Sequence, residues 1–404
     1  MKLWKKFLLG LVLVVLLSQI PFGYRRYKLG RLHAAIQALD SERSITTPDS
    51  EFTEFKGVAH VHSFLGGHSS GNFEDIIAAA KSNQLDFVVM TEHTSNDFNT
   101  AAMTLKGSHA GIVFLNGNEV SATNSDRMLI IPGDETTGKT TKPSTLDILS
   151  NPGSQGSFAV VAYPQEFKSW DASGYHGVEV YNVYTNARQI RPFMMFFDGL
   201  WSLRSYPDLL FATFYRRPAE NLKKWDEAIS ATGRKLVAVA GNDAHANIGA
   251  SLIDSSGKTL LGLQLDPYER SFHLVRIHLL LPKDKALTAA TLLETLSGGH
   301  CFIGYDLFGD TTGFRFTASN GTENKIQGDE IALQQEVRLF ASSPLPSRMV
   351  LLKDGTPVQD ESGLRVKEFV VREKGSYRLE VYLPQLPQPV SDQPWIISNP
   401  IYVR

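Results

Sequence analysis

The chain has 404 residues, of which 42% are hydrophobic and 20% are charged, and its formal net charge is −2. This length favours one catalytic domain with a smaller accessory domain. The near-neutral charge gives no support for nucleic-acid binding, because contact with a phosphate backbone needs a surplus of Lys and Arg. The single cysteine, Cys301, excludes an internal disulfide and a cysteine-rich zinc site.

An apolar segment begins the chain. A basic stretch at residues 2–6 precedes the run 7–20, which has no polar face, and further basic residues follow from Arg25 onward. No small-residue cleavage site follows the run. We therefore predict a retained signal anchor over residues 1–24, a transmembrane helix that enters the membrane through residues 7–24, rather than a cleaved signal peptide or a buried core helix.

The segment after the anchor, residues 25–54, is predicted to be a juxtamembrane linker with a lead helix. Basic residues flank both sides of the apolar run in similar number, so charge alone does not set its orientation. We expect the folded part of the chain on the extracytoplasmic side.

Short apolar runs alternate with polar or helical stretches from Phe55 onward. The runs are too short and too rich in Val, Ile and Phe for helices, and too continuous for strands with one exposed face, so they are predicted to be buried parallel strands of βα units. Asn72 can cap a helix that begins at Phe73 and ends near Gln84. The runs are 56–62, 85–93, 111–119, 158–164, 177–182 and 235–245.

An aromatic-rich stretch, residues 193–215, interrupts this alternation before an amphipathic helix at 218–231. It is predicted to form helices packed on the body of the protein. The alternative is an apolar flap near the membrane that admits a lipidic substrate. Asp198 and Arg204 argue against a second transmembrane span here.

The residues from Asp306 to the end alternate polar and apolar side chains between turn signals such as Asn320-Gly321. Short antiparallel strands are predicted at 336–341, 348–353, 367–372, 377–382 and 395–403. A small β-sandwich domain over residues 306–404 is the resulting prediction. Packing, anchoring or partner binding is the expected role of this domain.

Four of the predicted strands end in side chains that bind metals. In parallel α/β barrels functional groups collect at the carboxyl ends of the strands, and residues two apart in a strand face the same side. The convergence of imidazoles and carboxylates predicts a site for zinc, manganese or iron. The four strand ends carry His60-Val61-His62, Thr91-Glu92-His93, Gly117-Asn118-Glu119 and Asn242-Asp243-Ala244-His245. His68, in the glycine-rich loop six residues after His62, could bend back over the mouth.

These motifs resemble, in order and spacing, those of the PHP (polymerase and histidinol phosphatase) family over residues 55–305. The resemblance implies a distorted (β/α)7 barrel that holds two or three metal ions. Carried over, it implies one ion on His60, His62, Glu119 and Asp243, and another on His68, His93 and His245. Where the family usually has histidine before proline, this chain has Tyr163-Pro164, so two ions are expected rather than three.

The predicted reaction is hydrolysis of a small-molecule or lipid phosphate ester by a metal-activated water. The candidate catalytic residues are His93, His245 and Asp243, and the candidates to protonate the leaving group are His93, His245 and a metal-bound water. The candidate substrate contacts are Tyr163, Arg188 and Arg191. Two alternatives stay open: an amidohydrolase-like enzyme that cleaves C–N or lactone bonds, and a catalytically weakened, metal-dependent binding module at the membrane.

Overall fold

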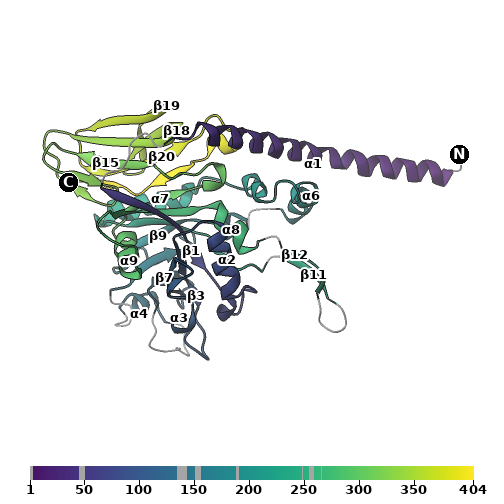
Figure 1. Ribbon diagram of the computed structural model, residues 1–404, viewed down its shortest axis with the longest axis horizontal. Coiled ribbons are helices and arrows are strands. Elements are labelled where there is room, and N and C mark those ends of the chain that lie inside the picture. Colours follow the sequence, from purple (N-terminus) through teal and green to yellow (C-terminus); the bar gives the residue numbers. More distant parts are fainter. Residues whose placement is uncertain are drawn as a thin grey trace.

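A long N-terminal helix projects from a mixed α/β body in the computed structural model of the chain (Figure 1). The structure describes residues 3–44, 51–133, 143–150, 156–187, 191–247, 249–253, 259–264 and 266–404.

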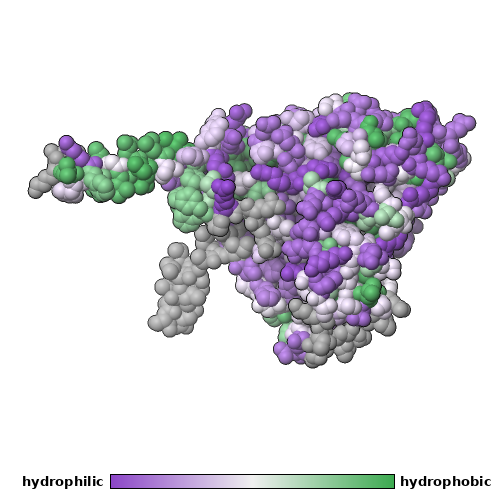
Figure 2. All heavy atoms as spheres, turned by 180° about the vertical axis from the view of Figure 1, so that it is seen from behind, coloured by the Kyte–Doolittle hydropathy of each residue, from purple (hydrophilic) through white to green (hydrophobic). Residues whose placement is uncertain are grey.

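Helix α1 covers Leu3–Glu42 without interruption, so the lead helix predicted after residue 24 is the continuation of the apolar helix. It is long and apolar enough to cross a membrane, and only 6% of its most apolar window is buried. Figure 2 shows the N-terminal half of α1 as a hydrophobic arm outside the body. The second half packs on the body through four buried side chains at helical spacing, which are Leu29, Leu32, Ile36 and Leu39.

The first sheet has six strands in the order β10-β9-β8-β7-β6-β3. β9 is parallel to β8 and β10, and β3 is parallel to β6, whereas β7 is antiparallel to both of its neighbours. The six predicted runs are therefore parallel where they pair with one another, and β7 is a strand that the sequence analysis missed. The bounds are β3 Glu92–His93, β6 Asn118–Ser121, β7 Arg127–Ile131, β8 Phe158–Ala162, β9 Gly177–Asn182 and β10 Val237–Gly241.

The second sheet has fourteen strands and combines strands from the first part of the chain, such as β1 and β2, with the C-terminal strands β15 to β22. β1 is parallel to β2 and antiparallel to β13, and β2 is parallel to β5. The bounds in this part are β1 Phe52–Val61, β2 Phe87–Met90, β4 Gly107–His109, β5 Ile112–Leu115, β13 Arg276–Pro282 and β14 Cys301–Gly304.

The C-terminal strands are antiparallel, as predicted, with one parallel pair, β17 with β22. They share the fourteen-stranded sheet with β1, because β14 pairs with β21, and β21 with β20. The boundary at 305/306 and a separate β-sandwich stay predictions, and these hydrogen bonds cross that boundary. The bounds are β15 Arg315–Ser319, β16 Asn324–Ile326, β17 Glu330–Ile331, β18 Val337–Lys353, β19 Thr356–Val371, β20 Gly375–Tyr382, β21 Ile396–Ser398 and β22 Ile401–Val403.

Helices cover the sheets and connect their strands (Figure 1). Asn72 caps α2 in a capping box with Asp75, as the sequence predicts. The helix bounds are α2 Phe73–Ser82, α3 Thr100–Met103, α4 Thr145–Ser150, α5 Val183–Ala187, α6 Pro192–Ser202, α7 Ala219–Thr232, α8 Tyr268–Leu274 and α9 Ala289–Ser297, with 3-10 turns η1 Phe64–Gly66, η3 Asp208–Thr213, η4 Asp306–Phe308 and η5 Val390–Asp392. A hairpin, β11 Gly249–Ile253 and β12 Thr259–Gln264, completes the described elements.

The carboxyl ends of β1, β2 and β10 are joined by backbone hydrogen bonds. The amide of His62 donates to the carbonyl of Ala244, and the amide of Thr91 donates to the carbonyl of Val61. Val61 and Ala244 form a parallel bridge. The ends of strands from the two sheets therefore lie together at one place, where the predicted ligands are.

Candidate metal centre

His60 and His62 are brought together by a distorted end of β1. The pairing of β1 with β2 shifts register between Ala59 and Val61, and His60 between them has a φ of 60°. This left-handed conformation is uncommon for a residue with a side chain. The two imidazole rings lie 5.0 Å apart.

Asp243 and His245 follow β10 in a similar way. β10 ends at Gly241, and Asp243 has a φ of 48°. Each pair was predicted to face one cavity because side chains two apart in a strand point to the same side. In the structure, however, His62 lies beyond the end of β1, and Asp243 and His245 lie beyond the end of β10. The left-handed backbone at His60 and Asp243 therefore sets how these side chains are oriented. Such strain persists where surrounding contacts enforce it, and it concentrates at functional sites.

Glu119 and His93 enter the cluster from neighbouring strands. They are register partners in the parallel pair β3 and β6. Oε2 of Glu119 lies 3.2 Å from Nδ1 of His93 and 3.4 Å from Nε2 of His60. Oδ1 of Asp243 lies 3.5 Å from Nε2 of both His60 and His62.

Two overlapping groups of ligand atoms result, and the atoms of each lie within 4.8 Å of one another. The first is the set predicted for one ion, and all four of its residues are buried. The second contains the less buried His93 and His245, and it shares His62 with the first. The groups are His60, His62, Glu119 and Asp243, and His62, His93 and His245.

Buried polar atoms in this cluster lack hydrogen bonds. Within the described residues, no hydrogen-bond partner is found for either ring nitrogen of His62 or for Oδ1 of Asp243. A buried polar group left unsatisfied costs about 1–3 kcal/mol. A cation held between these atoms would satisfy them, and imidazole with carboxylate is a donor set suited to zinc, manganese or iron. The residues present therefore fit a bound metal ion.

The protonation states of Glu119, Asp243, His62 and His93 suit ligation, because metal ligands must be free of protons. Burial alone would raise the pKa of Glu119, but His60 and His62 hold it at about 2. Burial would likewise raise the pKa of Asp243, yet the same imidazoles hold it well below its usual value. Burial and neighbouring imidazoles lower the pKa of both His62 and His93 to about 4. At neutral pH the carboxylates are ionised and these two histidines are neutral.

Glu179 on β9 orients His60 from behind. Its Oε1 lies 2.5 Å from Nδ1 of His60, and both side chains are fully buried. Nε2 of His60 therefore faces Glu119 and Asp243. Metal-binding histidines are usually oriented in this way, by a carboxylate that contacts the ring nitrogen on the other side. Burial would lower the pKa of His60, but Glu179 and Asp243 outweigh burial and raise it well above its usual value.

Gly241 makes room for this contact. A Cβ added there would lie 1.7 Å from Oε1 of Glu179 and 2.9 Å from Cβ of His60. Glu179 was not among the residues predicted for the site. The signal that could have found it is an acidic residue inside the apolar run of β9.

Tyr163, predicted as a substrate contact, lies in the site and donates a hydrogen bond of 2.6 Å to Oδ2 of Asp243. Burial and the carboxylate of Asp243 raise the pKa of Tyr163, so its hydroxyl stays protonated and keeps donating. Arg127, which the sequence analysis missed, lies beside it. Its guanidinium is 4.8 Å from the Tyr163 ring and 3.5 Å from Oε1 of Glu119.

Of the remaining predicted residues, His68 contacts one member of the cluster, and no described contact brings Arg191 into it. The ring of His68 lies 5.3 Å from the ring of His93, but His68 is exposed and belongs to neither ligand group, so its role as a ligand stays a prediction. Arg188 lies outside the described residues. Arg191 is exposed at the N-terminus of α6.

The fold and the site together define a mixed α/β protein with a buried histidine and carboxylate centre that could hold a metal ion. Neither a protein-family model nor a curated protein matches the chain. Among solved structures, the crystal structure of PsfC from Pseudomonas syringae PB-5123 is similar over 61% of this chain and 90% of that chain, at 12% identity and a TM-score of 0.35. A likeness at this level establishes neither a shared fold nor a shared function.

Proposed function

We propose that the chain is a metal-dependent phosphoesterase with a PHP-type (β/α)7 barrel over residues 55–305. The observation that carries the proposal is the convergence of His60, His62, Glu119 and Asp243 around unsatisfied nitrogens of His62. Two features support the barrel: the paired strands β1-β2-β5 and β3-β6-β7-β8-β9-β10 of the two sheets, and the backbone hydrogen bonds that join the residues after β10 to the end of β1.

Two ions fit this proposal. The buried group, His60, His62, Glu119 and Asp243, would hold one, and His93 with His245 would hold the other, with His62 or His68 completing its ligand set. When bound, the ions supply an activated water at neutral pH and neutralise negative charge on the phosphate.

The protein's own residues would orient the site and the substrate. Glu179 holds His60 in place, and the Tyr163 hydroxyl fixes one oxygen of Asp243. Arg127 is a half-exposed cation at the edge of the centre, so it replaces Arg191 as the side chain that we assign to the phosphate oxygens. His93 and His245 are partly exposed and can pass a proton to the leaving group.

One observation keeps the binding-module alternative in view. Tyr163 stands where the resemblance implies a histidine, and it occupies an oxygen of Asp243 that would otherwise be available to an ion. A weakened centre that binds phosphorylated ligands without turnover would have this feature. The amidohydrolase-like alternative has the same ligand types, and the choice of substrates decides between it and the phosphoesterase.

We propose further that α1 is a membrane anchor, because its apolar half is long enough to cross a membrane and lies outside the body. The side of the membrane on which the body lies stays a prediction, extracytoplasmic. Digestion of intact cells with added protease tests it, since only an exterior body is cleaved.

The full chain in detergent, loaded with zinc or manganese, is assayed for metal content and for hydrolysis of nitrophenyl phosphates and of amide and lactone substrates. We expect stoichiometric metal and phosphate release, and loss of both in His62→Ala. His109→Ala, a histidine on β4 whose ring contacts Phe114, serves as the matched control. Turnover of amides or lactones alone would favour the amidohydrolase, and tight binding of phosphorylated ligands without turnover would favour the binding module.

A further inference from the structure

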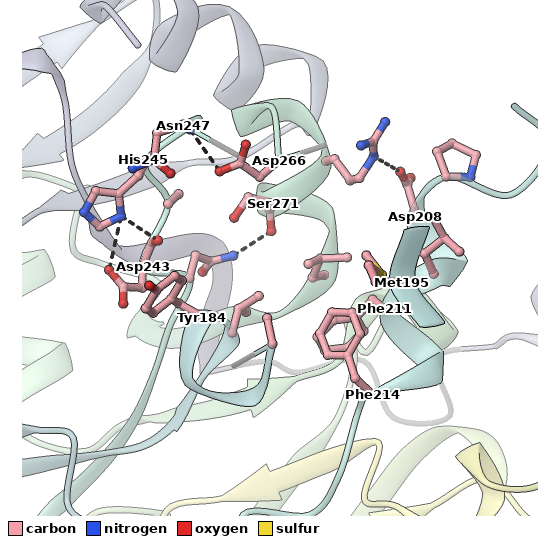
Figure 3. A pocket seen from close by; sticks show the side chains of 18 of the residues that line it. Tyr184, Met195, Asp208, Phe211, Phe214, Asp243, His245, Asn247, Asp266 and Ser271 are labelled. Atoms are coloured by element: carbon pink, nitrogen blue, oxygen red, sulfur yellow. Dashed lines mark hydrogen bonds and ion pairs between the residues drawn. The ribbon is translucent and has the colours of Figure 1, made fainter. Parts of the chain in front are cut away.

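An apolar cavity of about 290 Å³ adjoins the metal centre. This volume is close to the lower end of small-molecule sites, roughly 300–1,000 Å³. Asp243 and His245 line one side of it, and Met195, Phe211 and Phe214 line the opposite side (Figure 3). The cavity therefore leads from metal ligands to apolar side chains of α6 and of the η3 turn with its C-cap.

The same helix α6 also presents an apolar face to the outside. Phe193, Phe196 and Leu200 are spaced three and four residues apart, so they lie on one face, and they are 66%, 66% and 69% exposed. Large apolar side chains that are adjacent and exposed mark a surface for contact with a membrane or a partner. Met195, between them in sequence, lines the cavity instead.

Contacts with α1 decide in favour of a membrane. The ring of Phe197 stacks on Phe22 with centroids 4.8 Å apart. Arg25 forms a two-pronged ion pair with Asp198, with distances of 2.7 and 2.5 Å. Nε1 of Trp201 donates to Gln19 at 3.1 Å. These contacts place α6 directly beside the end of the apolar run of α1.

The position of α6 is that of a helix lying in the membrane interface, with aromatic residues on its apolar face and basic residues nearby. In Figure 2 the hydrophobic surface of α1 continues onto the body at the base of the helix. Arg191 and Arg204, at the two ends of α6, are both exposed and can contact anionic head groups.

We propose that the substrate is a phosphate ester of a lipid, taken from the bilayer beside α6, with its apolar chain in the cavity and its phosphate at the metal centre. This inference rests on the proposed function. In the reaction the P–O bond to the lipid alcohol breaks and an oxygen of water bonds to phosphorus. One proton of the water ends on the lipid alcohol, and the other is released or kept by the phosphate.

The first test uses the full chain, loaded with zinc or manganese and reconstituted in phosphatidylcholine vesicles, and compares its turnover of different substrates. The substrates are nitrophenyl phosphate and a series of alkyl phosphates of increasing chain length. We expect kcat/KM to rise about fourfold for each methylene that enters the cavity, and then to level off. A value of kcat/KM that is the same for all chain lengths would overturn the inference while leaving the phosphoesterase intact.

Variants separate the membrane face from the chemistry. We expect Leu200→Ser to lower turnover of vesicle-borne phosphatidic acid about tenfold and to leave nitrophenyl phosphate unchanged, because α6 then holds the interface less well. Leu146→Ser is the matched control: Leu146 is 64% exposed on α4, at the opposite end of the body (Figure 1). Met195→Glu places a charge in the cavity wall, and it should flatten the dependence on chain length. Equal losses on both substrates in Leu200→Ser would contradict the inference.

A readout without turnover keeps the two proposals apart. Cys301 is the only cysteine and is fully buried, so a fluorophore attached to Leu200→Cys labels α6 alone. Brominated lipids should quench this label but spare the same label on Leu146→Cys. Quenching with no phosphate release from any substrate would refute the phosphoesterase and leave α6 as a membrane contact. Phosphate release with no quenching at position 200 would refute the membrane contact.

Discussion

Replacing Glu179 with glutamine tests whether the contact behind His60 organises the metal centre. The side chain keeps its shape and can still accept a hydrogen bond from Nδ1, but it loses its charge. Buried hydrogen bonds to a charged group contribute about 1.5–3 kcal/mol, and neutral ones about 0.5–1.5 kcal/mol. The difference of about 1–1.5 kcal/mol corresponds to a roughly tenfold weaker affinity for metal. Loss of such outer partners typically weakens metal binding by about 10–100-fold.

The assay is a titration of zinc or manganese against a chelating dye, for the wild type and for Glu179→Gln. A matched control exists in Glu54→Gln, because Glu54 also contacts a buried histidine, Nδ1 of His278, at 2.8 Å, but away from the centre. The control should lower stability and leave metal affinity unchanged. If Glu179→Gln binds metal within twofold of the wild type, or if both variants lose affinity equally, Glu179 does not organise the site.

Further predictions concern stability and packing. Burial would lower the pKa of His278, but Asp306 and Glu54 outweigh burial and raise it to about 9, above the usual 6.5. The charge of His278 therefore stabilises the fold fully below about pH 6.5, and roughly 3 kcal/mol of the free energy of unfolding is lost as the pH rises through about 9. Denaturant titrations at a series of pH values should show this loss, and His278→Gln should remove most of it. Gly241→Ala should weaken metal binding at least as much as Glu179→Gln, because its Cβ would overlap the Glu179 carboxylate; an unchanged dye titration would contradict that packing. Free metal at a hundred times its Kd should stabilise the fold by about 2.7 kcal/mol, seen as a higher Tm, and a shift of equal size in His62→Ala would show that the ion binds elsewhere.

The residues that converge at the candidate metal centre were predictable because each lies at the end of an apolar run. The run marks a buried strand, and the residue that follows it marks the strand's carboxyl end. His60, His62, Glu119 and Asp243 could therefore be grouped before any tertiary contact was known. The order of the motifs and their resemblance to one family supplied the grouping into two ions.

The residues that support the ligands could not be found in this way. Glu179 is 119 positions from the histidine that it contacts, and Arg127 is a single arginine at the start of a short strand. Their roles depend on which strands become neighbours in space. The left-handed backbone at His60 and Asp243 was equally hidden, because neither residue type demands it.

One error at the level of elements has a local cause. Two short strands were expected at 336–341 and 348–353, whereas β18 runs through Pro344 and Pro346 with register shifts toward β19. Prolines are tolerated in strands at such bulges. The lead helix expected after residue 24 forms as the second half of α1, because its residues repeat leucine and isoleucine at helical spacing.

The continuity of α1 has a mechanical consequence. Its 40 residues form a rod of about 60 Å. Its C-terminal half is packed into the core through Leu29, Leu32, Ile36 and Leu39. Helix α6 contacts α1 at Phe22, just before this packed half begins. With α1 as the proposed anchor, a body held in this way would not swing freely below a bilayer, as it would on a flexible tether. Its height and tilt would be set by the rod, so a proposed substrate would have to reach one fixed depth.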